Sequence, residues 1–205
     1  MVKNVVFDMG GVILDLDITE ALVRFKELGM SNIETYLDPY EQKDFFLELE
    51  QGKVSASQFC QKLSQLTGKD ISYEQAQWAW LGFIVDVPQY KLDYIEELKK
   101  NYNVHLLSNT NPFIMGWTRS SEFTPSKRPI TDYFDKIYAS YEVGATKPDK
   151  KIFEFMIEDS EMIPSETLFV DDGKKNIEIG EELGFKTYMP ANKEDWRSAI
   201  DNLIK

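Results

Sequence analysis

The sequence predicts an α/β protein in which helices flank a parallel sheet and a helical subdomain is inserted after the first strand. Three short apolar runs predict strands that are buried on both faces, and each run ends at a polar residue. These runs are Val5 to Phe7 before Asp8, Val104 to Leu107 before Ser108, and Leu168 to Val170 before Asp171. Helical patterns lie between and after the runs, and strands that alternate with helices are typical of a parallel sheet.

The other elements of the sheet domain are predicted from apolar periodicity and from the residues that begin and end helices. Strands are expected at 136–140 and 185–189, and helices at 88–102, 149–158, 173–183 and 193–204. Pro88 lies near the start of the first of these helices, and Gly184 closes the third. The polar, turn-rich stretch 119–131 is expected to form an exposed loop.

The stretch 16–87 interrupts the alternation, because it carries several helical patterns in a row and no convincing strand. Three helix starts are marked by capping patterns: Asp17 with Glu20, Ser55 with Gln58, and Ser72 with Gln75. The apolar run 78–85 is expected to be a buried helix end or a pocket wall. We therefore predict a core domain made of residues 1–15 and 88–205, and a helical cap subdomain made of residues 16–87.

Composition narrows the class of protein and its partners. A chain of 205 residues with 42% apolar types can bury a full core, and 35 acidic against 23 basic residues would repel a phosphodiester backbone. The longest apolar run has eight residues, against the roughly 20 that span a bilayer. With Cys60 as the only cysteine and no signal-peptide pattern at the start, we expect a cytoplasmic monomer or homodimer that binds neither nucleic acid nor membrane.

Polar residues follow three of the predicted strands, at the edge where open parallel sheets bind ligands. Asp8, Ser108, Asp171 and Asp172 all lie there. Taken singly, an aspartate after a strand is more often a turn or helix-cap residue. The convergence of four such residues at one edge favours a binding site. His105, the only histidine, lies within a predicted strand and is expected to be a core residue or a neighbour of the site.

Four segments resemble the signature motifs of the haloacid dehalogenase (HAD) superfamily of phosphohydrolases, in the expected order and over nearly the whole chain. They are Val5-Val6-Phe7-Asp8-Met9-Gly10-Gly11-Val12-Ile13, Leu106-Leu107-Ser108-Asn109-Thr110-Asn111, Lys147-Pro148, and Phe169-Val170-Asp171-Asp172 followed by Asn176. The resemblance implies a Rossmann-like core, an inserted cap and a phosphoric monoester hydrolase. The residues of these motifs resemble most the branch of the family that contains bacterial α-D-glucose-1-phosphate phosphatase.

The resemblance also implies a nucleophile and a metal site. Asp8 is expected to attack the phosphoryl group and form an aspartyl-phosphate intermediate. The Mg²⁺ site is expected to include Asp8, the backbone carbonyl of Gly10, Asp172 and Asp171, with Asn176 in support. Phosphoryl transfer needs positioning and charge neutralisation more than covalent assistance, and Mg²⁺ prefers carboxylate and carbonyl oxygens.

A second group of residues is expected to bind the phosphorylated small-molecule substrate. The resemblance assigns Ser108, Asn109, Lys147, Gly10 and Gly11 to this group, with Ser108 and Lys147 also taking part in catalysis. A serine hydroxyl and a backbone N–H at a strand end can donate hydrogen bonds to phosphoryl oxygens. A lysine there offsets the charge of the nucleophile and of the transferred group.

The cap is expected to close over the substrate and to exclude water. Its residues of first interest are Glu50, Gly52, Trp78 and Trp80. Indole faces often pack against sugar rings, although packing between cap helices explains both tryptophans equally well.

Position 10 departs from the pattern, because most phosphatases of the resembled family carry there a second aspartate that protonates the leaving oxygen. Gly10 has no side chain for that role, which typically contributes about 10²–10⁴ in rate. Asp15 and Asp17 are too far along the chain to replace it. A substrate with a good leaving group would need less help, which favours a sugar 1-phosphate.

Two alternatives stay open at this point. A metal-binding HAD-like protein with little turnover, acting as a binding or regulatory module, would tolerate glycine at position 10. A 2-haloacid dehalogenase-type hydrolase would share the aspartate nucleophile but needs no metal, so the adjacent acids Asp171 and Asp172 argue against it.

Overall fold

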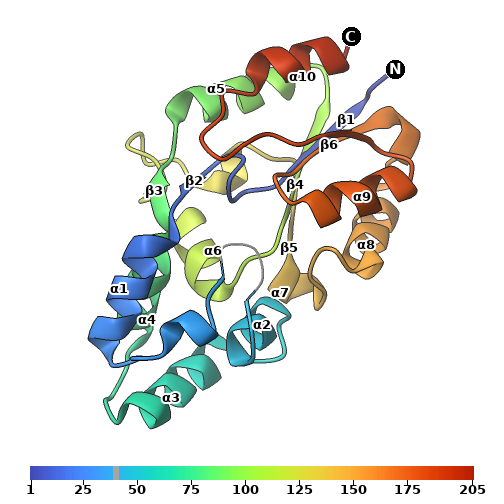
Figure 1. The fold of residues 1–205 in the computed structure, drawn as a ribbon. Helices are drawn as coiled ribbons and strands as arrows, with labels where there is room; N and C mark the ends of the chain where they lie inside the picture. Colours follow the sequence, from blue (N-terminus) through green and yellow to red (C-terminus); the bar gives the residue numbers. More distant parts are fainter. Residues whose placement is uncertain (39–41) are drawn as a thin grey trace.

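A five-stranded parallel sheet forms the centre of the computed structural model, which describes residues 1–38 and 42–205 (Figure 1). The strand order is β5-β4-β1-β6-β7, and all four neighbouring pairs are parallel. The strands are β1 (Asn4–Phe7), β4 (Asn103–Ser108), β5 (Lys136–Ala139), β6 (Thr167–Val170) and β7 (Lys186–Tyr188). The predicted α/β fold with a helical insertion is thereby confirmed, and each predicted strand is present.

The central strand β1 sets the register of the sheet. All four of its residues are buried, and Val5 lies opposite Val104 of β4 and Leu168 of β6. Because parallel strands end at the same edge of a sheet, the residues that follow β1, β4 and β6 lie side by side there. Figure 1 shows that this edge faces the inserted helices, whereas both chain termini lie at the opposite end of the molecule.

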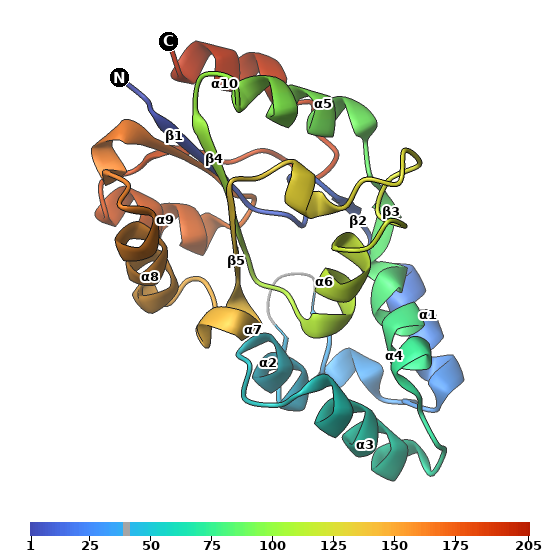
Figure 2. The same ribbon diagram turned by 180° about the vertical axis from the view of Figure 1, so that it is seen from behind.

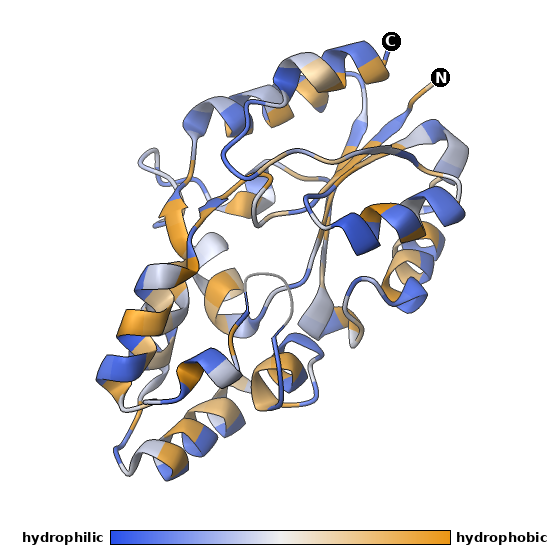
Figure 3. Ribbon diagram, viewed as in Figure 1, coloured by the Kyte–Doolittle hydropathy of each residue, from blue (hydrophilic) through white to orange (hydrophobic). Residues whose placement is uncertain are grey.

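Two pairs of helices cover the two faces of the sheet (Figures 1 and 2). One face carries α5 (Gln89–Leu98) and α10 (Arg197–Leu203), and the other carries α8 (Lys150–Ser160) and α9 (Lys174–Glu182). The fully buried Trp196 holds the segment before α10 against the sheet domain. Its indole donates a hydrogen bond to the Val12 carbonyl at 2.8 Å, and its ring lies 5.1 Å from that of Phe7. Figure 3 shows apolar residues concentrated in the central strands and mixed with polar residues on the helices.

The insertion is helical, and its helix starts follow the capping patterns. Its elements are α1 (Ile18–Leu28), η1 (Ile33–Thr35), α2 (Phe45–Glu50), α3 (Ala56–Thr67), α4 (Tyr73–Trp80) and η2 (Leu81–Phe83). Ser55 and Ser72 both form complete capping boxes. Asp17 caps α1 through the N–H of Thr19, while Glu20 pairs with Arg24 instead of completing a box.

The expectation of no strand within 16–87 is wrong at the two ends of that range. Two short antiparallel strands, β2 (Asp15–Leu16) and β3 (Ile84–Asp86), connect the sheet to the inserted helices: the chain enters the insertion through β2 and leaves it through β3. The predicted boundaries at 15/16 and 87/88 fall at this connection. Lys91 of α5 is completely buried and reaches the Asp15 carboxylate at 3.1 Å, so an ion pair anchors the connection to the sheet domain.

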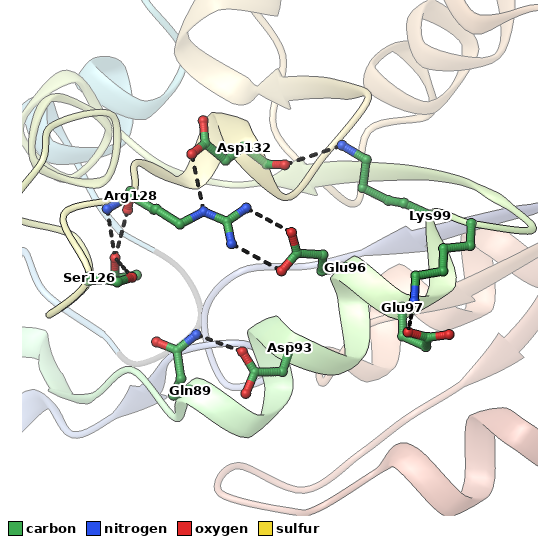
Figure 4. A network of polar contacts seen from close by, with 10 residues as sticks. Gln89, Asp93, Glu96, Glu97, Lys99, Ser126, Arg128 and Asp132 are labelled. Atoms are coloured by element: carbon green, nitrogen blue, oxygen red, sulfur yellow. Dashed lines mark hydrogen bonds and ion pairs between the residues drawn. The ribbon is translucent and has the colours of Figure 1, made fainter.

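The stretch 119–131 is a largely exposed loop, as expected, but part of it is packed into the protein. Phe123, Thr124 and Ile130 are buried. Arg128 holds the loop against α5, because its guanidinium binds both carboxylate oxygens of Glu96 at 3.0 Å (Figure 4). The short helices α6 (Pro112–Thr118), η3 (Ile130–Asp132), α7 (Ser140–Val143) and η4 (Pro164–Glu166) complete the fold.

A membrane-spanning helix is not found in the described ranges 1–38 and 42–205, since none of their helices is both long enough and apolar enough.

An aromatic cluster forms the core of the inserted helices, and it yields a stability prediction. Phe46 is fully buried and its ring lies 4.7–5.6 Å from those of five other aromatic residues. We expect Phe46→Ala to lower the free energy of unfolding by about 3–5 kcal/mol, because it removes buried apolar surface and leaves a cavity. Leu66→Ala, at a position of α3 that is 51% exposed, should change it by less than about 0.5 kcal/mol. Urea denaturation followed by tryptophan fluorescence measures both, and equal effects would contradict the prediction.

Candidate active site

A cavity of about 630 Å³ lies where the carboxyl edge of the sheet meets the inserted helices. This volume is within the usual range for small-molecule sites. The sheet domain contributes Asp8, Gly10, Asn109, Thr110, Lys147 and Asp172, and the inserted helices contribute Gln42, Leu47, Glu50, Gln51, Trp80 and Phe83. Of the four polar residues that the sequence places at this sheet edge, Asp8 and Asp172 line the cavity, whereas Ser108 and Asp171 do not.

Asp8 is the residue that follows β1 and is 9% exposed. Its backbone N–H donates to the carbonyl of Val170, which continues the pairing with β6, and its Oδ1 accepts from the N–H of Met9 at 2.7 Å. These contacts fix the carboxylate at the floor of the cavity. A carboxylate in this position can act as a nucleophile toward a ligand above it.

Lys147 lies at the centre of the polar cluster. Its ammonium contacts Asp8 at 3.0 Å and Asp171 at 2.6 Å, and donates to the Leu107 carbonyl at 2.9 Å. Burial alone would lower the pKa of Lys147, but Asp171 and Asp8 together outweigh it and the pKa is raised. Lys147 therefore carries a permanent positive charge beside Asp8.

Asn109 has a positioning role that the sequence did not reveal. Its side chain donates to the Lys147 carbonyl and accepts from the Lys147 N–H, both at 2.8 Å. The amide thereby clamps the lysine backbone to the end of β4. A pair of hydrogen bonds between residues 38 positions apart leaves no local signal in the sequence.

The two adjacent acids after β6 differ in their surroundings. Asp171 is completely buried, and its carboxylate oxygens are already bound by protein groups. It pairs with Lys147 and accepts hydrogen bonds from the Gly173 N–H and the Asn176 amide. Asp172 lines the cavity, where its carboxylate is open to a ligand. This difference favours Asp172 over Asp171 as a direct metal ligand.

The acidic cluster has the donor chemistry of a hard divalent cation. Oxygens of Asp8, Asp171 and Asp172 lie within 4.8 Å of one another. Burial raises the pKa of Asp8 to about 7, against the attraction of Lys147 and with the repulsion of the other two carboxylates. Burial and Asp171 likewise raise the pKa of Asp172 to about 6. Keeping all three carboxylates ionised at neutral pH requires more positive charge than Lys147 supplies, and Mg²⁺ fits such a set of oxygens.

The two glycines after Asp8 have different surroundings. Gly11 has φ +71°, and a Cβ there would lie 2.1 Å from Oδ2 of Asp172, so only glycine lets the two segments approach. Gly10 lies outside the left-handed region, and its Cβ would meet only the flexible tip of Leu16 at 2.8 Å. Gly10 lines the cavity, whereas Gly11 packs against Asp172.

Other candidate residues are placed as follows. Ser108 is buried at the end of β4, its hydroxyl donates to the Asn109 carbonyl at 3.3 Å, and it is not among the residues that line the cavity. Trp80 lines the cavity, but Trp78 is 39% exposed and packs against Arg24. His105 is buried in β4, and burial lowers its pKa, in agreement with a core position.

This fold and site define a hydrolase of the α/β class with an inserted cap, and comparison with known proteins names the family. The family model of the haloacid dehalogenase-like hydrolases matches residues 2–184, and the chain belongs to that family. The chain is 53% identical to the D-ribitol-5-phosphate phosphatase of Bacteroides thetaiotaomicron over 204 residues, which cover 100% of this chain and 99% of that protein.

Two solved structures support the same family. A HAD-like hydrolase from Porphyromonas gingivalis has a TM-score of 0.96 and 45% identity, covering 100% of this chain and 98% of that one. A HAD family enzyme from Bacteroides thetaiotaomicron, in complex with magnesium and inorganic phosphate, has a TM-score of 0.89 and 37% identity, covering 97% of this chain and 99% of that one.

The contact between Gly11 and Asp172 yields a matched pair of variants. We expect Gly11→Ala to abolish detectable Mg²⁺ binding, because the new methyl group must displace the Asp172 carboxylate. Gly144→Ala is the control, since Gly144 has φ +82° with nothing within 4 Å of its Cβ, so it shares the backbone strain without a clash. It should cost about 1 kcal/mol of stability and leave Mg²⁺ affinity unchanged. Titration calorimetry measures the affinity, and the same affinity in both variants would refute the assignment.

Proposed function

We propose that the protein is a magnesium-dependent phosphatase of a small phosphorylated polyol, and that it acts through an aspartyl-phosphate on Asp8. The observation that carries this proposal is the cluster at the cavity floor, where Asp8 is held by Lys147 beside the open carboxylate of Asp172. The family adds weight, because its members are hydrolases.

Each residue of the cluster has a distinct role in this proposal. Asp8 attacks phosphorus, and Lys147 neutralises charge on Asp8 and on the transferred group. Asp8, Asp172 and the carbonyl of Gly10 would hold Mg²⁺, with Asp171 and Asn176 supporting them. When bound, the cation neutralises and orients the phosphoryl oxygens. Ser108 and the N–H of Asn109 are proposed to receive those oxygens at the end of β4.

The substrate class follows from the relatives and from the cavity wall. The relative of 53% identity acts, by its name, on D-ribitol 5-phosphate, which is a sugar-alcohol phosphate. Trp80 Nε1 and Thr110 Oγ1 are buried at the cavity without a hydrogen-bond partner among the described residues. Buried polar atoms are rarely left unpaired, so we propose that a small shift of the cavity wall brings these two groups to substrate hydroxyls. We propose a pentitol 5-phosphate as the preferred substrate.

A sugar 1-phosphate is the second candidate, and Gly10 is the observation that favours it. Position 10 lines the cavity without a side chain, so it offers no proton to the leaving oxygen. An anomeric oxygen needs less protonation than the primary alcohol of a pentitol. The two candidates therefore differ in whether the cavity holds another acid.

Phosphate release from a substrate panel tests the proposal. With Mg²⁺ we expect kcat/KM for D-ribitol 5-phosphate to exceed that for α-D-glucose 1-phosphate by about tenfold or more, since a single well-matched polar contact is worth roughly 1–3 kcal/mol. Excess chelator should abolish turnover of both substrates. A preference for the 1-phosphate would select the second candidate, and full activity in chelator would refute the metal requirement.

Asp8→Asn tests the nucleophile. The amide is nearly isosteric with the carboxylate but a very poor nucleophile, so we expect a folded protein with turnover reduced by at least about 10⁴-fold. Circular dichroism and the thermal midpoint establish that the variant is folded. Substantial phosphate release by the folded variant would mean that water or another residue makes the attack.

A further inference from the structure

The cavity contains one carboxyl group that neither the nucleophile nor the acidic cluster accounts for. Glu50 is the last residue of α2, is 8% exposed, and lines the same cavity as Asp8 and Gly10. Its side chain makes no hydrogen bond or ion pair with any residue in the described part of the chain, and it is not one of the three clustered acids. A buried carboxylate without a partner is costly, so the neutral acid is the favoured form.

The surroundings of Glu50 favour that neutral form for three reasons. It is itself buried, and its helix neighbours Phe45, Phe46 and Leu49 are all buried. It stands at the C-terminus of α2, where unpaired carbonyls disfavour a negative charge. Burial, with a smaller contribution from the charge of Asp8, raises the pKa of Glu50 to about 8. Glu50 is therefore a proton donor at neutral pH.

A close backbone contact holds Glu50 over the sheet edge. Two residues after it, Gly52 has φ +68°, and a Cβ there would lie 2.1 Å from the carbonyl oxygen of Tyr141 in α7. No other residue type lets the chain after α2 come so near to the sheet domain. The contact seats the end of α2 against α7, and this places the Glu50 carboxyl in the cavity that Asp8 occupies from below.

We propose that the carboxyl of Glu50 is the general acid that protonates the leaving oxygen, in the role for which position 10 has no side chain; this rests on the proposed phosphatase function. In the first step a bond forms between Asp8 Oδ and phosphorus, the bond from phosphorus to the substrate oxygen breaks, and the Glu50 proton passes to that oxygen. The products are the alcohol, the aspartyl-phosphate and the Glu50 carboxylate.

The second step returns the proton. Water bonds to phosphorus while the bond from phosphorus to Asp8 breaks, and the Glu50 carboxylate accepts a proton from that water. Inorganic phosphate leaves, and both Asp8 and Glu50 return to their starting forms. No further reactant is required.

Leaving-group dependence tests the proposal with Glu50→Gln. This variant keeps the shape and polarity of the side chain but holds no transferable proton. We expect it to slow release of the alcohol in the first turnover of D-ribitol 5-phosphate by about 10²–10⁴-fold, and release of nitrophenolate in the first turnover of p-nitrophenyl phosphate by less than about threefold, because nitrophenolate leaves without a proton. Steady-state turnover of both substrates falls, because hydrolysis of the aspartyl-phosphate loses the base that accepts the proton from water. Gln51→Ala removes a neighbouring polar group of the same cavity and should change both substrates by the same factor.

A rescue variant separates chemistry from structure. Because Gly10 has an ordinary backbone conformation and only the tip of Leu16 nearby, we expect Gly10→Asp in the Glu50→Gln background to recover at least tenfold of the lost alkyl-phosphate turnover. A role for Glu50 in folding or in metal binding predicts no such recovery. Mg²⁺ affinity, measured by calorimetry, should be the same in the unmodified protein and in Glu50→Gln.

Three results would overturn the assignment of Glu50. They are an equal loss of the first-turnover rate on both substrates in Glu50→Gln, no loss on either substrate, or a fall in Mg²⁺ affinity that matches the loss of activity. Failure of the proposed function is distinguishable, because the unmodified protein would then release no phosphate from either substrate. Turnover by the unmodified protein, with equal losses of the first-turnover rate in the variant, rejects only the general acid.

Discussion

The ion pairs of Lys147 are the constraint on which the site depends. One buried ammonium satisfies Asp8 after β1 and Asp171 after β6, and so ties together two strand ends that would otherwise repel each other. Removing one partner of such a buried pair typically costs about 3–5 kcal/mol, because it leaves an uncompensated charge. Asn109 then clamps the lysine backbone from β4, so three neighbouring strands contribute to one arrangement.

The inserted helices complete the site from above. Their aromatic core around Phe46 packs them together, and the short β2–β3 connection joins them to the sheet. The close approach of Gly52 to α7 sets how near they come to the carboxyl edge. Packing far from the chemistry therefore decides what Asp8 faces across the cavity.

Local patterns predicted most of the fold, and long-range contacts decided the rest. Apolar runs located the strands, and Ser55 and Ser72 located two helix starts because a capping box lies within four residues. The strands β2 and β3 escaped prediction, because two or three residues carry no periodicity and their pairing joins distant segments. The motifs placed Asp8 and its neighbours at one sheet edge. The hydrogen bonds of Asn109 to Lys147 and the ion pair of Arg128 with Glu96 were not predicted, because each joins residues more than 30 positions apart.

A proton donor on the inserted helices, rather than at position 10, would couple chemistry to closure. An aspartate at position 10 would belong to the sheet domain, whereas Glu50 lines the cavity from α2, whose end is packed against α7. Water exclusion and proton donation would then arrive together. A ligand that prevents the contact of Gly52 with Tyr141 would bind beside Asp8 without a nearby acid. Alcohols that are too large would then be turned over slowly, because the movement that accommodates the alcohol also supplies its proton.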